Sequence, residues 1–194
     1  MGQELVRMQA LFATVRYRGE QDTDCLLLEP NPAAKIKNIL IQNDTSQRNW
    51  FLLHPDRDRA CSHDKKKCSV NSPHFAVKSG FIHHQVCDGI LVMQEGVHIT
   101  IFYFDLKSTS TSGVSAQFKS MKCFVRYTLA LIDYAQQPVE KAFCFICNPD
   151  SKLTPKDRFK KNEGLTSNLE FPVFEVRVRN GQKLCLSEFC NTVP

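Results

Sequence analysis

A β-hairpin followed by a long amphipathic helix and a further apolar strand is the pattern that most constrains this chain. Residues 86–93 and 97–106 are apolar, strand-like runs separated by Gln94-Glu95-Gly96, a tight-turn sequence. A Ser/Thr/Gly stretch at 108–113 leads into apolar residues spaced three or four apart: Val114, Phe118, Met121, Val125, Leu129 and Ile132. This spacing predicts a helix of about five turns with one apolar face. Residues 141–147 then form another buried strand, which favours a mixed sheet.

Weaker patterns predict the N-terminal part of the fold. Helical spacing of apolar residues predicts an opening helix up to about Tyr17. Residues 35–42 and 49–54 are apolar runs joined by an Asn43-Asp44 turn, so they suggest a hairpin. Residues 56–73 are rich in charged side chains and are expected to form an exposed loop or insertion.

The remaining runs complete a single predicted domain over residues 1–194. Residues 75–84 are a third strand-like run before the central hairpin, and residues 173–178 and 182–186 suggest a late hairpin around Asn180-Gly181. We therefore expect an α/β protein with a mixed β-sheet flanked by helices and a β-rich C-terminal extension. The core is expected at about 75–147.

Composition excludes several classes of protein. The 194 residues are 42% hydrophobic and include 14 Phe, which is too apolar for a disordered chain. No apolar run approaches the roughly 18 residues needed to span a bilayer, and the N-terminus has no signal-peptide pattern, so we expect a cytoplasmic protein with no membrane partner. A net charge of +5 permits a polyanionic partner without requiring one.

Charged residues at the end of the central hairpin carry the strongest chemical signal. With Glu95-Gly96 as the turn, Asp88 lies opposite Tyr103, and strand alternation places Asp105 and Lys107 on the same face. Two crowded carboxylates repel each other unless a cation lies between them, and hard oxygen ligands select Mg²⁺ or Mn²⁺. The sequence therefore predicts a metal site at Asp88 and Asp105, with Lys107 beside it.

These residues, in the order Asp88, Asp105-Leu106-Lys107 and a following helix, resemble the PD-(D/E)xK nuclease superfamily, which has a restriction-endonuclease-like fold. The resemblance covers roughly residues 75–147. It implies that Asp88 and Asp105 bind the metal, that Lys107 assists the attacking water, and that Gln117 occupies a position that is often Gln in related nucleases. Cys87 stands where the motif's name has Pro, and Asp105 replaces the more frequent Glu.

Many members of the superfamily also carry an acidic residue on the first helix. Glu4, Glu20 and Glu29 are the candidates for this role in the present chain, and Glu20 is preferred.

Basic and hydroxyl side chains are the candidates for contacts to a nucleic-acid backbone. Lysine and arginine gain affinity for phosphates by releasing counterions. The residues expected to make such contacts are Ser108, Lys119, Lys122, Arg126, Lys156, Arg158, Lys160 and Lys161. A solvated helix face or linker would explain the basic groups equally well.

Nine cysteines suggest an alternative site. Without an export signal they are expected to be reduced thiols, and most fit small core positions. Two close pairs, Cys144 with Cys147 and Cys185 with Cys190, would together provide four ligands for a structural Zn²⁺.

The expected function is that of a Mg²⁺- or Mn²⁺-dependent endonuclease that hydrolyses phosphodiester bonds, preferably in DNA. A role in restriction or anti-phage defence is expected. A homodimer is one of the oligomeric states considered. Two alternatives stay open: a catalytically inactive nuclease-like binding or inhibitory module, and a zinc-stapled nucleic-acid-binding domain.

Overall fold

The computed structural model describes residues 2–12, 15–29, 31–55, 82, 85–108, 111–148 and 158–192. The predicted loop at 56–73 lies outside these residues, as does the predicted strand at 75–84 except for residue 82. Among the helices described, none combines the length and the apolar character that crossing a bilayer requires.

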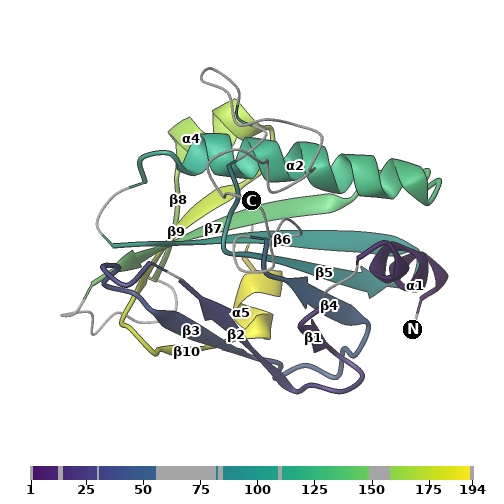
Figure 1. The fold of residues 1–194 in the computed structure, drawn as a ribbon, viewed down its shortest axis with the longest axis horizontal. Helices are drawn as coiled ribbons and strands as arrows, with labels where there is room; N and C mark the ends of the chain where they lie inside the picture. Colours follow the sequence, from purple (N-terminus) through teal and green to yellow (C-terminus); the bar gives the residue numbers. More distant parts are fainter. Residues whose placement is uncertain are drawn as a thin grey trace.

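A seven-stranded mixed sheet forms the centre of the molecule (Figure 1), in the spatial order β1-β4-β5-β6-β7-β9-β8. Strands β4, β5 and β6 are mutually antiparallel, β7 and β9 continue parallel to β6, and β8 is antiparallel to β9. The strands are β1 (Tyr17–Arg18), β4 (Trp50–Leu53), β5 (Gly89–Glu95), β6 (His98–Lys107), β7 (Val139–Cys147), β8 (Phe159–Lys161) and β9 (Val173–Val178). The predicted α/β class with a mixed, helix-flanked sheet is thus confirmed.

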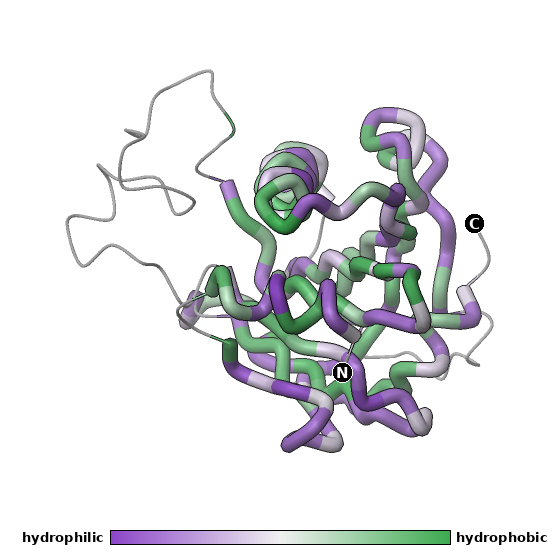
Figure 2. The backbone as a smooth tube through the Cα atoms, turned by 90° about the vertical axis from the view of Figure 1, so that its right-hand side faces the viewer, coloured by the Kyte–Doolittle hydropathy of each residue, from purple (hydrophilic) through white to green (hydrophobic). Residues whose placement is uncertain are grey.

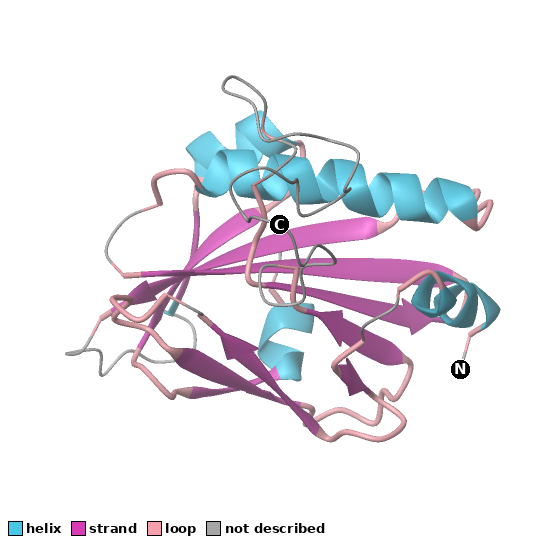
Figure 3. Ribbon diagram, viewed as in Figure 1, coloured by secondary structure: helices cyan, strands magenta, loops and turns pink. Residues whose placement is uncertain are grey.

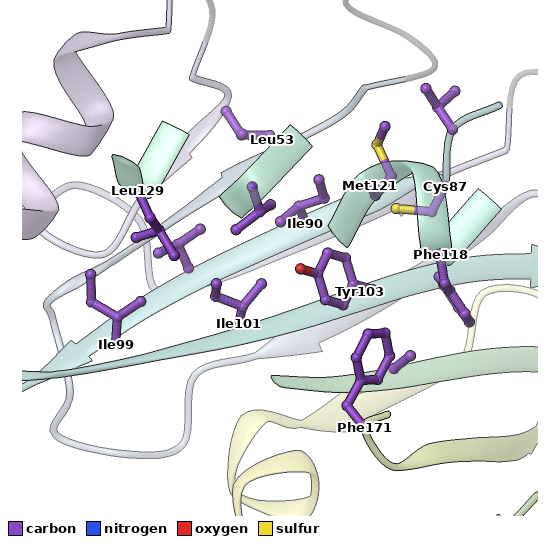
Figure 4. Packing of buried hydrophobic residues seen from close by; sticks show 14 of the residues in the cluster. Leu53, Cys87, Ile90, Ile99, Ile101, Tyr103, Phe118, Met121, Leu129 and Phe171 are labelled. Atoms are coloured by element: carbon purple, nitrogen blue, oxygen red, sulfur yellow. The ribbon is translucent and has the colours of Figure 1, made fainter. Parts of the chain in front are cut away.

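Within the described part of the chain, one face of this sheet is covered by α1 (Gln3–Ala10), α2 (Val114–Leu131) and α4 (Glu163–Leu169). Helix α2 begins after Gly113, whose φ of 80° favours glycine. Its apolar residues pack on Ile90, Ile101 and Tyr103 of the sheet (Figure 4). The helix predicted from apolar spacing is therefore present and covers the central hairpin.

A second, three-stranded sheet covers the opposite face, in the order β10-β3-β2 (Figure 3). Its strands are β2 (Asp24–Leu28), β3 (Asn38–Gln42) and β10 (Lys183–Cys185), and the short helix α5 (Leu186–Cys190) follows. The central strands are thus buried on both sides, and Figure 2 shows hydrophobic segments concentrated in the interior.

This division into two sheets corrects both outer hairpins. Strand β3 pairs with β2 and β10, whereas β4 pairs with β1 and β5, so the runs at 35–42 and 49–54 belong to different sheets. Strand β10 likewise pairs with β3 and not with β9, so the Asn180-Gly181 turn carries the chain from one sheet to the other. A turn sequence specifies a reversal of direction but does not specify the pairing partner.

Other boundaries also differ from expectation. The opening helix ends at Ala10, and Tyr17 begins β1. The first strand of the antiparallel meander is β4, so the core extends beyond 75–147 on both sides. The C-terminal part is less β-rich than predicted, because it contains α4 and α5 and contributes β8 and β9 to the main sheet.

The packing of α5 generates a test of the layered arrangement. Phe189 is fully buried, and its ring centroid lies 4.9 Å from that of Phe143 and 5.5 Å from those of Phe104 and Phe159. We expect Phe189→Ala to lower the free energy of unfolding by about 3–5 kcal/mol, because it removes a large core side chain. Urea denaturation measures the change. Val139→Ala, at a half-exposed strand end, should change it by less than about 0.5 kcal/mol, and equal effects would contradict this packing.

Candidate active site

The predicted Asp-Lys group lies where β5 begins and β6 ends. The β-ladder pairs Glu95 with His98 and Gly89 with Phe104, so the turn residues are Gly96 and Val97. Gly96 has a φ of 59°, as a tight hairpin turn requires. The register differs by two residues from the predicted one, in which Asp88 was opposite Tyr103. A shift of two residues leaves every side chain on the same face.

Asp88 and Asp105 lie just beyond the last pair of the ladder, Gly89 and Phe104, with Asp88 directly before β5 and Asp105 on β6. Both are buried, with exposed fractions of 6% and 1%. The backbone N–H of Asp88 donates to Phe104 O at 2.9 Å, and Asp88 Oδ2 accepts from the N–H of Leu106 at 2.6 Å. Asp88 is therefore fixed against β6 from both its backbone and its side chain.

Lys107 connects this acidic pair to helix α2. Its Nζ lies 2.9 Å from Asp105 Oδ2 and donates to Gln117 Oε1 at 2.8 Å. Gln117 Nε2 donates in turn to Val86 O at 2.9 Å, so the amide is held at both ends. With 22% of its side chain exposed, Lys107 is accessible to solvent, and Gln117 is also only partly buried. The structure thus brings Asp88, Asp105, Lys107 and Gln117 together, as predicted.

Burial raises the pKa values of both carboxyl groups. Burial, followed by the charge of Asp105, raises the pKa of Asp88 well above its ordinary value. Burial also raises the pKa of Asp105 to about 6, although Lys107 and a hydrogen bond with the Asp88 side chain lower it. For Lys107, burial lowers the pKa, but Asp105 and Asp88 outweigh this effect and raise it, so the ammonium stays charged.

The acidic pair fits a hard divalent cation. Two buried carboxyl groups in hydrogen-bonding contact repel when both are ionised, and a cation between them removes that repulsion. Mg²⁺ is commonly held by one or two carboxylates and keeps several waters. Among the residues that the structure describes, no group of three or more His, Cys, Asp or Glu side chains is placed to hold a metal.

Glu29 is the further acidic residue associated with the pair. Its charge raises the pKa of both Asp88 and Asp105. It follows β2, where Leu27 Cδ2 lies 2.5 Å from the position that a Cβ on Gly89 would occupy, so the two sheets approach each other closely here. Glu29 is one of three acidic candidates in the sequence, and it is the stacking of the two sheets that brings it, and not Glu20, near the Asp88–Asp105 pair.

The preferred candidate, Glu20, is not at this site. It is exposed in the turn after β1, next to Gly19, whose N–H donates to Trp50 O. Trp50 pairs with Met93, five residues from Asp88, or about 17 Å along an extended strand. Glu4 is also at that far end, where it accepts from Gln94 Nε2.

Several of the basic residues that were predicted to contact phosphate form ion pairs with carboxylates of the protein itself. Lys122 is buried and donates to Leu169 O and Glu170, while Arg126 pairs with Glu140 at 3.5 Å. Arg158 pairs with Glu188 at 2.9 Å, and Lys161 lies 3.6 Å from Glu163. Lys119 and Lys160 are exposed, and Lys156 lies outside the described residues. Two of the basic residues of α2 thus form ion pairs that link the helix to the end of α4 and to β7.

Ser108 has a structural contact beside the site. Its Oγ accepts the backbone N–H of Lys35 at 2.9 Å, which places the 31–37 connection next to Lys107. The serine hydroxyl hydrogen stays available for a phosphate oxygen, and the Lys35 side chain is exposed.

The cysteine pairs do not form the predicted four-thiolate arrangement. Cys144 faces the helix-covered core and Cys147 packs on the opposite core, because residues three apart on a strand point to opposite faces. Cys185 and Cys190 lie at the two ends of α5. The zinc alternative is therefore not supported by the geometry of Cys144 and Cys147.

Comparisons of the chain with protein-family models, curated proteins and solved structures gave no match. The functional assignment therefore depends on the geometry of the site.

The raised pKa of Asp105 gives this site a pH signature. Protonation stabilises the folded form between the ordinary pKa of Asp and about 6, so stability of the metal-free protein should fall as pH rises through that window. Asp105→Asn cannot ionise and should be more stable than the wild type at about pH 8 in EDTA, by an amount on the order of 2 kcal/mol.

Urea denaturation at several pH values measures this difference, which should disappear near pH 4. Asp133→Asn, at a side chain that is 91% exposed, is the matched control and should show no such pH dependence. Equal stability of the wild type and Asp105→Asn at pH 8 would show that burial does not raise the pKa of Asp105.

Proposed function

We propose that this protein is a metal-dependent phosphodiesterase of the PD-(D/E)xK type that cleaves nucleic acid, with DNA as the expected substrate. The observation that carries the proposal is the buried Asp88–Asp105 pair with Lys107 held 2.9 Å from Asp105 and fixed by Gln117. A fold gains nothing in stability from two buried carboxyl groups in contact, whereas a metal site requires them. The succession of antiparallel β4, β5 and β6, then α2 and parallel β7, is consistent with the same superfamily.

Each residue then has a defined task. Asp88 and Asp105 would hold Mg²⁺ or Mn²⁺, which acts as a Lewis acid and makes bound water more acidic. Lys107 stays protonated next to Asp105 and offsets negative charge that grows on a phosphate. Gln117 is a positioning residue, because it touches Lys107 and Val86 O and holds the ammonium over the acidic pair.

The exposed groups beside the site suit a polyanionic substrate. Lys35 and Ser108 adjoin Lys107 through the hydrogen bond between the Lys35 N–H and Ser108 Oγ. These side chains are the basic and hydroxyl groups that we assign to backbone phosphates near the scissile bond.

Removing either chemical group should abolish cleavage. We expect Asp105→Ala and Lys107→Ala each to reduce the rate by several orders of magnitude, because one loses a metal ligand and the other the charge beside it. Purified protein is incubated with duplex DNA, single-stranded DNA and RNA, each with Mg²⁺, Mn²⁺ or EDTA, and the products are resolved by electrophoresis.

Asp133→Asn and Lys183→Gln, both exposed, are the matched controls and should cleave at the wild-type rate. Thermal denaturation of every variant separates loss of chemistry from loss of fold. Cleavage by Asp105→Ala at the wild-type rate would overturn the assignment. Binding without cleavage under every metal condition would favour the inactive nuclease-like module.

The positioning role of Gln117 predicts a smaller effect. Gln117→Leu removes the acceptor that orients Lys107 but keeps both carboxylates, so the cleavage rate should fall about 10- to 100-fold. The apparent Mg²⁺ affinity, measured from the metal dependence of the rate, should change less than the rate itself. A variant with unchanged rate would show that Asp105 alone positions the lysine.

A further inference from the structure

A second polar cluster lies on the helix-covered face, at the other end of α2. A cavity of about 260 Å³ opens where α2 ends and β7 begins. Its lining includes Arg126, Leu129, Tyr134, Gln137, Pro138 and Glu140. The cluster shares no residue with the Asp88–Asp105 site.

Glu140 is the buried group of this cavity, with an exposed fraction of 9%. Tyr103 donates its hydroxyl to Glu140 Oε1 at 2.6 Å, which is a short and strong hydrogen bond. Arg126 Nη2 approaches Glu140 Oε2 at only 3.5 Å, and half of the Arg126 side chain is exposed. Oε2 is therefore the carboxylate oxygen with capacity for a further donor, and the guanidinium beside it has N–H groups to spare.

The charges of Glu140 and Arg126 nearly cancel within the cavity. A simple anion or cation would gain little from such a pair. A neutral ligand that carries a hydrogen-bond donor next to acceptors matches it, because the carboxylate accepts and the guanidinium fork donates. Nucleobases have this character, and carboxylate contacts to the cytosine amino group are a standard form of base recognition.

The walls of the cavity suit a flat ring. Tyr134 is fixed, because its hydroxyl accepts the N–H of Ile99 at 3.0 Å and donates to Val97 O at 3.2 Å. Leu129 and Pro138 add apolar surface to the lining. Unstacked bases are commonly held by aromatic and apolar side chains while their Watson–Crick edge is read by polar groups.

We propose that this cavity binds an unstacked nucleobase and prefers cytosine. The cytosine edge offers one amino donor for Glu140 Oε2 and two acceptors for Arg126, whereas guanine offers two donors where Oε1 is already occupied by Tyr103. The inference rests on the proposed function. Arg126 lies nine residues after Gln117 on α2, about 14 Å along the helix, so the pocket would read a base a short distance from the cleaved phosphate.

Binding of mononucleotides tests the pocket without cleavage. CMP, UMP, AMP and GMP are titrated in EDTA into the wild-type protein, and binding is followed by NMR. CMP should bind roughly fivefold or more tightly than UMP. In Glu140→Gln the amide oxygen keeps the Tyr103 contact and the amide NH₂ replaces the acceptor, so the preference for CMP should be lost or should reverse towards UMP.

Ala130→Phe is a second variant, because this exposed helix residue lines the cavity and a phenyl ring there should block binding while leaving the charges intact. Arg18→Gln, at an exposed arginine on β1, is the control and should bind like the wild type. No binding of any nucleotide, or equal binding of all four that survives Ala130→Phe, overturns the proposal. Since these titrations need no metal and no cleavage, their outcome is independent of whether the Asp88–Asp105 site hydrolyses nucleic acid.

Discussion

Strand β6 is the constraint on which the rest of the structure depends. It pairs with β5 on one side and β7 on the other along nearly its whole length. Its side chains alternate between two separate cores: Ile101 and Tyr103 face the helices, whereas Phe102 and Phe104 face the small sheet. A change of one residue in its register would move every one of these side chains into the wrong core. The positions of Asp105 and Lys107 are therefore fixed by the packing of the apolar residues that precede them.

Helix α2 organises two buried polar clusters on the same face of the sheet. Near its beginning Gln117 holds Lys107 beside the carboxyl pair, and near its end Arg126 approaches Glu140. Tyr103 and Asp105 are neighbours on one face of β6 but serve different clusters. Buried polar groups need well-placed partners, and in both clusters β6 provides some of them as well as the helix: the Leu106 N–H binds Asp88, and the Tyr103 hydroxyl binds Glu140. The length of α2 between Gln117 and Arg126 therefore sets the distance between the proposed cleavage site and the proposed base pocket.

Local pattern was sufficient to predict the central unit. The hairpin, α2 and β7 follow from alternation and helical spacing, and the shared face of Asp88 and Asp105 survived a two-residue error in register because the strand period is two. The partition of the outer strands into two sheets could not be predicted, because pairing partners distant in sequence leave no local signal. The internal contacts of Lys122 and Arg158 were missed for the same reason: an exposed basic residue and one that binds a distant Glu look identical in sequence.

The internal ion pairs change how the positive charge of this chain should be understood. The formal net charge is +5, but Lys122 binds the end of α4 and Arg158 binds α5, where their charges are balanced by Glu170 and Glu188. Charges that are already paired release few counterions when a phosphate approaches, so they add little to affinity for nucleic acid. Among the residues that the structure describes, Lys35 is the exposed lysine that adjoins the site, through the hydrogen bond of its N–H to Ser108. Binding that depends on a small number of phosphate contacts needs another source of affinity, and a pocket that encloses a base provides it through stacking and hydrogen bonds.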